Sequence, residues 1–319
     1  MTSQPINEGL LSFIQEQTGR GVVYEQEPIP LLGGIDATTY KFKLRGMEPM
    51  VLRLLGSDRS AEEVKRLQIH SQALIQSNIK APKVYWVGEE KSLLGGVFAI
   101  MEFFPDPLLA GQPGDIQLKI LGESHAEMHN TSTSKIINCL KEQGLNEKDF
   151  MGPLLMPTIL ESAQIDHPWL SNIFNWLRNN LPISSAQASI NHGDYHPKNI
   201  MYASEHITGV IDWNFFIGDP AFDVGHTITL IMDIGPNISD DYNLETASQY
   251  NEQYRDAYQS VRPINDKAVA ACRASQCTGF LLHCLSGKKD IIATSPSMRR
   301  SLTHTIENIT DLKIAFPDS

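Results

Sequence analysis

The stretch that constrains this chain most runs from residue 191 to residue 225 and places polar side chains at fixed spacing. Asp194 is followed five residues later by Asn199, and a second aspartate, Asp212, ends the largely apolar run 207–211. A carboxylate can orient and deprotonate a hydroxyl, while an amide and a second carboxylate can hold Mg²⁺ on nucleotide phosphates. These residues therefore predict a phosphoryl-transfer site, with Asp194 as the catalytic residue and Asn199 and Asp212 as metal ligands.

The local pattern around these positions predicts a strand, a loop and a hairpin. Alternating apolar residues at 186–190 indicate a strand that enters the loop, and Pro197 bars a helix there because it has no backbone N–H to donate. Two short strands, 199–202 and 208–212, are then joined by a tight turn. Such a hairpin brings the amide and the second carboxylate together, and hard oxygen ligands of this kind suit Mg²⁺. The alternative is that both aspartates only form turns between strands.

Taken together, these residues resemble the aminoglycoside phosphotransferase and choline kinase family. The family's catalytic loop reads His-Gly-Asp-x-x-x-x-Asn, as residues 192–199 do here, and its metal-binding aspartate is commonly followed by tryptophan, as in Asp212-Trp213. Residues 218–223 also fit the family pattern. The resemblance is firm from Leu32 to about Leu230, and it implies a small-molecule kinase with a fold like that of protein kinases.

That resemblance implies an α+β, bilobal chain. Residues 1–104 would form a small antiparallel-sheet lobe that binds nucleotide and ends in a hinge, and residues 105–319 a larger, mainly helical lobe for catalysis and substrate binding. Apolar periodicity and a capping box at Ser60 and Glu63 agree with this order. The expected helices are 4–18, 60–77, 116–129, 170–177, 242–260 and 266–286, and the expected N-terminal strands are 40–44, 50–55, 82–87 and 97–103. The rest of 130–181 reads as polar and mixed.

On the nucleotide side, the family covers the phosphates with a glycine-containing hairpin, because only glycine lets the backbone approach that closely. Gly33 and Gly34 occupy this position, although the pair also suits an ordinary hairpin turn. Family members often continue with Ser-Asn, where this chain has Asp36-Ala37, and a carboxylate beside a triphosphate is unfavourable unless it points away. Thr38 and Thr39 could still offer hydroxyl or backbone contacts.

Three further expectations concern a basic residue that binds phosphate, its acidic partner and the hinge. Arg53 stands on the strand where kinase-like enzymes usually carry a phosphate-binding lysine, and arginine can bind phosphate through two N–H groups, although it could also be a solvated surface residue. No acidic residue aligns with the usual helix partner of that cation, so helical phase alone suggests Glu63. Backbone groups of Glu102 and Phe104 would read the adenine edge in the hinge, which leaves ATP and GTP both open as donors.

Composition limits the partners. The net charge of −11 argues against a nucleic-acid partner, since binding to phosphate backbones requires clustered positive charge. The most apolar stretch, 93–104, is interrupted by Gly95, Gly96 and Glu102, so no membrane span is expected. The four cysteines form no Cys-x-x-Cys pair, which favours a cytoplasmic protein without a zinc site.

The substrate class remains open at this level. A small hydroxylated acceptor is expected, and acidic residues such as Asp233, Asp240, Asp241 and Glu245 could receive an amine, although a solvated acidic loop is the favoured interpretation of them. His192, Asp219 and Asp223 are expected to brace the loop rather than react. The rival hypothesis is a non-catalytic nucleotide-binding pseudokinase or scaffold. A protein kinase is disfavoured by the missing Asp-Phe-Gly and Ala-Pro-Glu signatures.

Overall fold

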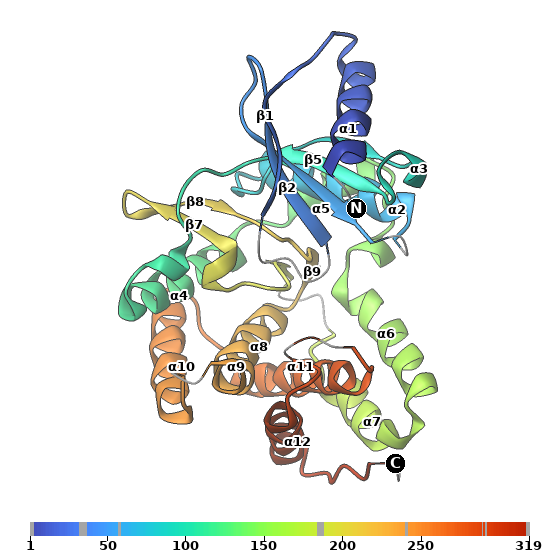
Figure 1. Ribbon diagram of the computed structural model, residues 1–319. Helices are drawn as coiled ribbons and strands as arrows, with labels where there is room; N and C mark the ends of the chain where they lie inside the picture. The colour runs from blue at the N-terminus through green and yellow to red at the C-terminus, as the bar shows by residue number, and fades with distance from the viewer. Residues whose placement is uncertain are drawn as a thin grey trace. The chain divides into compact units, whose positions relative to one another are not determined.

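The computed structural model describes residues 3–31, 37–56, 59–183, 188–239, 242–288, 290 and 292–316. The chain divides into two compact units (Figure 1). The first comprises Met1–Pro107, Lys135–Gln143 and Met201–Ile211, and the second comprises Leu108–Ser134, Gly144–Ile200 and Asp212–Ser319. The fold is α+β as predicted, with an antiparallel sheet in the first unit and mainly helices in the second. The predicted lobe boundary at residue 104 remains a prediction, since two later segments also pack in the first unit.

A five-stranded sheet forms the centre of the first unit, and its neighbouring strands all pair antiparallel. Its order is β1-β2-β3-β5-β4, so the three sequential strands β1, β2 and β3 meet the pair β4 and β5 at β3 and β5. The strands are β1 (Tyr24–Leu31), β2 (Ala37–Leu44), β3 (Met50–Leu55), β4 (Val84–Gly88) and β5 (Phe98–Glu102). Strand β1 was not predicted, because it is an edge strand that carries two prolines and leaves most of its side chains exposed.

Helices cover both faces of this sheet. On one face, Leu10, Phe13 and Ile14 of α1 (Ser3–Thr18) pack against Phe42 and Phe98. On the other face, a second apolar cluster joins Val64 of α2 (Ala61–Gln76) to Val84 of β4, to Ala99 and Met101 of β5, and to Val97 just before β5. A short helix, α3 (Lys91–Leu94), adds Leu94 to the first cluster. The alternation of the strands therefore decides which of their side chains lie on the α2 face.

The predicted capping box opens α2 (Ala61–Gln76). The Ser60 side chain accepts a hydrogen bond from Glu63 N, and the Glu63 carboxylate accepts one from Ser60 N. Two of the helix's otherwise unpaired N–H groups are satisfied in this way. The helix ends at Gln76, one residue before the end that the sequence predicts.

The hairpin after the Asp194 loop follows the prediction closely. Strands β7 (Ile200–Ala203) and β8 (His206–Val210) are joined by Ser204 and Glu205, whose φ angles are 52° and 63°. Two successive residues with left-handed φ form a two-residue turn whose twist matches that of the flanking strands. The hairpin belongs to the first unit, where Gly209 lies against the ring of Phe104.

The second unit is built from helices around the short antiparallel pair β6 (Ser189–Asn191) and β9 (Phe216–Gly218). Helix α4 (Gly114–Asn130) packs on α10 (Leu244–Gln259), and α8 (Ala221–Thr229) on α11 (Asp266–Leu285), as Figure 1 shows. Close approach is possible because Gly122 and Gly225 have no Cβ at these contacts. The other principal helices of the described second unit are α6 (Gly152–Asp166), α7 (Ser171–Asn180) and α12 (Pro296–Thr310).

Two helices lie where the sequence was interpreted as polar and mixed, so that interpretation was wrong. Helix α5 (Ser134–Glu142) buries Ile136, Cys139 and Leu140, which follow the helical spacing of a single apolar face. Helix α6 contains Pro157 in its interior, and an internal proline normally counts against a helix.

Candidate active site

The loop that carries Asp194 lies between β6 and β7 and begins with a sharp turn. Gly193 has a φ angle of 82°, and a Cβ at this position would lie 2.7 Å from the Asn214 carbonyl oxygen. Asn214 N also donates to the His192 carbonyl at 2.8 Å. Only glycine meets both requirements, a left-handed φ and close approach of a second backbone. The loop therefore packs closely against the segment that follows Asp212.

Asp194 and Asn199 are in direct contact across this loop. Asn199 Nδ2 donates to the Asp194 carbonyl at 3.0 Å and to the Asp194 carboxylate Oδ2 at 3.3 Å. The amide nitrogen therefore takes both bonds to Asp194, and the amide oxygen is left for another partner. Residues 197–199 form a single 3-10 turn that opens at Pro197, in agreement with the prediction that no α-helix crosses the loop.

Asp212 lies directly after β8, at the point where the chain turns back toward β9. It adopts a left-handed φ of 60°, a conformation that aspartate tolerates better than most residues. Two residues later, Asn214 bonds to the loop, and the ring of Trp213 lies 4.5 Å from the ring of His192. The structure therefore places Asp212 on the segment that runs beside the Asp194 loop, and its carboxylate is half-buried.

A buried carboxylate, Asp223, holds the backbone of the loop. Its two oxygens accept hydrogen bonds from His192 N at 2.5 Å and from Gly193 N at 2.7 Å. Asp223 lies in the first turn of α8, and its side chain is fully buried. The predicted bracing role of Asp223 is borne out by these contacts. Asp219, also predicted to brace a turn, accepts from Ala221 N at 2.9 Å.

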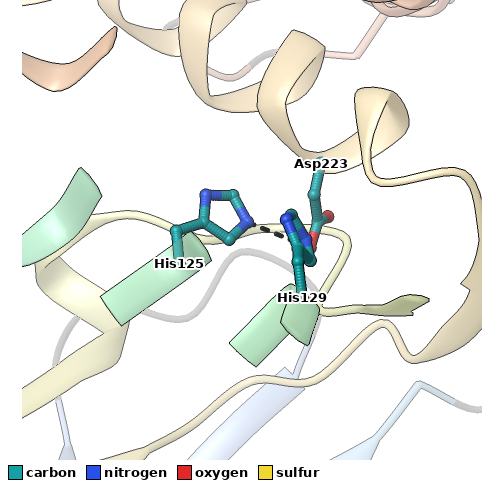
Figure 2. A group of neighbouring side chains, drawn as sticks. All are labelled: His125, His129 and Asp223. Carbon is teal, nitrogen blue, oxygen red and sulfur yellow. Dashed lines mark hydrogen bonds and ion pairs between the residues drawn. The ribbon is translucent and has the colours of Figure 1, made fainter. Parts of the chain in front are cut away.

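Two histidines on α4 turn toward Asp223 (Figure 2). Their Nε2 atoms lie 3.3 Å (His125) and 3.5 Å (His129) from Asp223 Oδ2. On the other side of each ring, Nδ1 meets a tyrosine hydroxyl of α10, Tyr254 at 2.9 Å and Tyr258 at 2.7 Å. The simplest proton assignment has each hydroxyl donating to Nδ1 and each Nε2–H pointing at the carboxylate. Two neutral histidines then support one aspartate.

The titration behaviour of this cluster follows from its burial. Burial and the neighbouring His129 lower the pKa of His125 to about 4, against the opposing effect of Asp223. Burial also lowers the pKa of His129. For Asp223, burial would raise the pKa, but the hydrogen bonds and charge of the two histidines outweigh it, and the pKa lies well below its ordinary value. An ionised Asp223 beside neutral histidines is the expected state near neutral pH.

Histidines also contact the Asp194 carboxylate. His226 Nε2 lies 3.1 Å from Oδ1, and His196 Nε2 lies 3.5 Å from Oδ2. Burial alone would raise the pKa of Asp194, but these two neighbours outweigh it and hold that pKa well below its ordinary value. His226 was not among the site residues predicted from the sequence. A signal was present, because His226 follows Asp223 by three residues and therefore shares its helical face.

The predicted nucleotide-side residues lie partly outside the described structure. Gly33, Gly34 and Asp36 are among the residues that are not described. In the sheet, Thr39 is paired with Arg53, so their side chains share the face that α2 covers. Thr38 is paired with Leu54 and lies on the opposite face. The two threonine hydroxyls therefore point to opposite faces of the sheet, and only Thr39 lies on the same face as Arg53.

The remaining candidates have local partners. The Glu63 carboxylate bonds to Ser60 N at 2.7 Å and to Arg59 Nη1 at 2.9 Å, so a pairing with Arg53 would require it to exchange partners. The Glu102 side chain accepts from Lys83 N at 3.1 Å. The backbone groups proposed to read a base are not tested by these contacts. The roles of Glu63, Glu102 and Phe104 remain predictions.

One of the acidic residues offered for an amine is not available to a ligand. Asp233 is buried, and its Oδ2 accepts from Arg273 at 2.8 Å while its Oδ1 accepts from Thr305 at 2.6 Å. It stabilises the packing of α11 and α12 instead. Asp240 and Asp241 are not among the described residues, and Glu245 is exposed at the start of α10. No helix in the described ranges is long and apolar enough to cross a membrane.

The sequence profile of the phosphotransferase enzyme family matches residues 27–264 of this chain, which include the whole loop, hairpin and Asp223 region. The chain belongs to this family. The predicted resemblance is thereby confirmed, and the chain is a phosphotransferase that acts on hydroxyl groups of small substrates. A search of curated protein sequences finds no match.

Solved structures share the fold of this family member at low sequence identity. A Ralstonia eutropha protein assigned as an aminoglycoside phosphotransferase matches with a TM-score of 0.61 and 20% identity, covering 95% of this chain and 98% of its own. A macrolide 2′-phosphotransferase from Brachybacterium faecium gives 0.57 and 15%, covering 92% and 98%. Choline kinase from Cryptosporidium parvum gives 0.55 and 14%, covering 90% and 89%. At these identities the comparison establishes the fold.

Proposed function

We propose that this phosphotransferase moves the γ-phosphoryl group of a Mg²⁺-nucleotide, with ATP as the first donor to test, to a hydroxyl of a small molecule. The observation that carries the proposal is the contact between Asp194 and Asn199 in a loop whose backbone is fixed by buried Asp223. Phosphoryl transfer depends mainly on positioning and electrostatic stabilisation, and a rigid loop supplies the first of these.

In this proposal, Asp194 orients the acceptor hydroxyl and takes its proton as the bond to phosphorus forms. The low pKa of its carboxylate makes it a weak base in the ground state. Its main contribution is then alignment, and it receives the proton late, when the hydroxyl has become acidic by bonding to phosphorus. His192 braces the loop, since its Nδ1 accepts from Asp194 N at 3.1 Å.

The donor set fits a hard divalent cation. Asn199 keeps its amide oxygen after both Nδ2 bonds to Asp194, and Asp212 supplies one half-buried carboxylate. Mg²⁺ is usually bound by one or two carboxylates together with substrate phosphates. When bound, such an ion neutralises charge on the phosphoryl group. We assign Asn199 and Asp212 as its protein ligands.

The nucleotide assignment is supported by two structures that share this fold. A spectinomycin phosphotransferase was solved with ADP (TM-score 0.53), and an amicoumacin kinase with AMP-PNP and Ca²⁺ (TM-score 0.56). In this chain, Arg53 would bind phosphate, together with Thr39 on the same sheet face and the Gly33-Gly34 backbone. Glu102 and Phe104 would contact the base. GTP remains the alternative donor, and the acceptor is a small hydroxylated compound that could carry an amine.

The decisive experiment is a screen for ADP release with Mg²⁺-ATP and a panel of hydroxylated metabolites and antibiotics, run with the wild type and Asp194→Ala. We expect at least one acceptor to stimulate release, and we expect Asp194→Ala to lower turnover by about 10²–10⁴-fold. Nucleotide binding without any transfer, with ATP or GTP, would favour the non-catalytic alternative.

A further inference from the structure

Helix α8 contacts the catalytic loop through three side chains: Thr227 Oγ1 donates to the Tyr195 carbonyl at 2.8 Å, and Asp223 and His226 bind the loop from one face of the helix. Asp223 binds the backbone of His192 and Gly193, and one turn later His226 binds the carboxylate of Asp194. The Asp223 contact fixes the path of the loop. The His226 contact fixes the orientation of the Asp194 side chain rather than the path of the backbone.

His226 is itself held from the far side of its ring. Its Nδ1 lies 3.1 Å from Oε1 of Gln276 on α11, and its ring is tilted against that of Phe280, with centroids 5.9 Å apart. The residue is buried, with 8% of its surface exposed. Both ring nitrogens therefore have hydrogen-bond partners outside α8, and these two partners hold the imidazole ring in one orientation.

We propose that His226, braced by Gln276, is a positioning residue that occupies Asp194 Oδ1 and leaves Oδ2 to receive the acceptor hydroxyl. The inference rests on the proposed function, in which Asp194 is the group that meets the acceptor. Oδ2 lies 3.3 Å from Asn199 Nδ2, and its other neighbour, His196 Nε2, lies 3.5 Å away, too far for a strong hydrogen bond, so Oδ2 has capacity for the acceptor hydroxyl. The chain Gln276–His226–Asp194 thus sets the orientation of the carboxylate from a helix outside the loop.

The direction of the His226–Asp194 bond does not depend on how Gln276 is oriented. With the amide oxygen facing Nδ1, both ring nitrogens carry protons and the ring is cationic. With the amide reversed, its NH₂ donates to Nδ1 and the neutral ring still donates through Nε2–H. In both arrangements a donor faces Oδ1.

Electrostatics agree with the geometry. Burial lowers the pKa of His226, but the hydrogen bond and charge of Asp194 and the contact with Gln276 outweigh it, so the pKa is raised. Asp194 from the loop and Gln276 from α11 contact the ring nitrogens, and Asp223 from α8 and His125 from α4 act on the ring through their charge. Two of these are carboxylates, and both favour a protonated ring.

The test combines a measurement that needs no acceptor with one that measures turnover. In the first, the pKa of His226 is followed by NMR of its ring Cε1–H in the wild type and in Asp194→Asn. We expect the pKa to fall when the carboxylate is replaced, since its charge supports the protonated ring. An unchanged pKa would overturn the inference, whether or not the protein proves to be a kinase.

In the second measurement, kcat and KM for Mg²⁺-dependent ATP hydrolysis, with water as acceptor, are compared in His226→Leu, His226→Gln and Gln276→Leu. We expect His226→Leu to lower kcat about 10–100-fold with little change in KM, because a misplaced catalytic group costs rate rather than binding. His226→Gln keeps an N–H at similar reach and should restore most of the rate, whereas Gln276→Leu should show a smaller loss.

A matched control is available on α11, where His283 pairs with Asp290 at 2.7 Å. His283→Gln removes a histidine–aspartate pair of the same kind and should leave kcat unchanged. A kcat of His226→Leu within about twofold of the wild type, or a loss in His226→Leu that His226→Gln fails to restore, would overturn the positioning role. If the wild type turns over no nucleotide, the proposed function fails, and the NMR measurement alone decides the contact.

Discussion

Acidification should destabilise this protein through the buried histidines behind the catalytic loop. Burial lowers the pKa of His125 from 6.5 to about 4. As the pH falls, His125 is therefore protonated in the unfolded chain before it is protonated in the folded protein. The free energy of unfolding decreases between the two pKa values. At 1.36 kcal/mol per unit, the complete shift corresponds to roughly 3 kcal/mol, of which about 2 kcal/mol is lost between pH 7 and pH 5.

The assay is urea unfolding at pH 7 and pH 5, followed by tryptophan fluorescence. Three of the four tryptophans (Trp169, Trp176 and Trp213) lie in the unit that contains His125. The perturbation is His125→Gln, which removes the titrating group and keeps an N–H toward Asp223. The variant will be less stable at pH 7, but its loss between pH 7 and pH 5 should be smaller than that of the wild type by about 2 kcal/mol.

The control is His206→Gln, which removes an exposed histidine at the start of β8. It should lose as much stability on acidification as the wild type. If His125→Gln also loses as much as the wild type, His125 is not held neutral in the folded state. The assignment of two neutral histidines around an ionised Asp223 would then be refuted.

Two further predictions concern the loop and the buried cluster. Gly193→Ala should destabilise the protein by more than about 1–2 kcal/mol and lower turnover, since a left-handed φ and a 2.7 Å approach to Asn214 both exclude a side chain. Urea unfolding measures the change in stability, and ATP hydrolysis measures the change in turnover. A variant with wild-type stability would contradict this prediction. Dialysis against EDTA should abolish phosphoryl transfer yet leave the Tm unchanged. His125, His129 and Asp223 lie close enough to hold a metal ion, but each histidine Nδ1 is paired with a tyrosine hydroxyl and Asp223 with the loop backbone, so we expect no metal there. Tightly bound zinc found by elemental analysis, or a lower Tm, would contradict this expectation.

The sequence predicted the parts of the fold that local patterns specify. Strand β3 begins and ends at the expected residues, Met50 and Leu55, and the Ser60 capping box is present. The β7–β8 turn also forms where expected. Each of these rests on neighbouring residues, whose spacing and turn chemistry are visible without tertiary contacts. Strand β1 and helix α6 were missed because their prolines conflict with local propensity and packing overrides it.

The same distinction applies to the site. Asp194, Asn199 and Asp223 could be picked out together from the 191–225 block, because their contacts lie within or directly on one loop. Their supports come from distant segments. Tyr254 and Tyr258 meet the α4 histidines 129 residues away in sequence, and Gln276 reaches His226 across 50. No local spacing encodes contacts of that range, so only the packing of α4, α8, α10 and α11 could reveal them.

Asn199 and Asp212 are proposed to hold one divalent ion on the nucleotide whose γ-phosphoryl group is transferred beside Asp194. Mn²⁺ binding to the protein with AMP-PNP, measured by electron paramagnetic resonance, tests it most directly in Asn199→Ala, Asp212→Ala and the double variant. We expect one nucleotide-dependent Mn²⁺ site that each single variant weakens, with losses that do not add in the double variant because both residues share the ion. Wild-type Mn²⁺ affinity in both single variants would contradict the account.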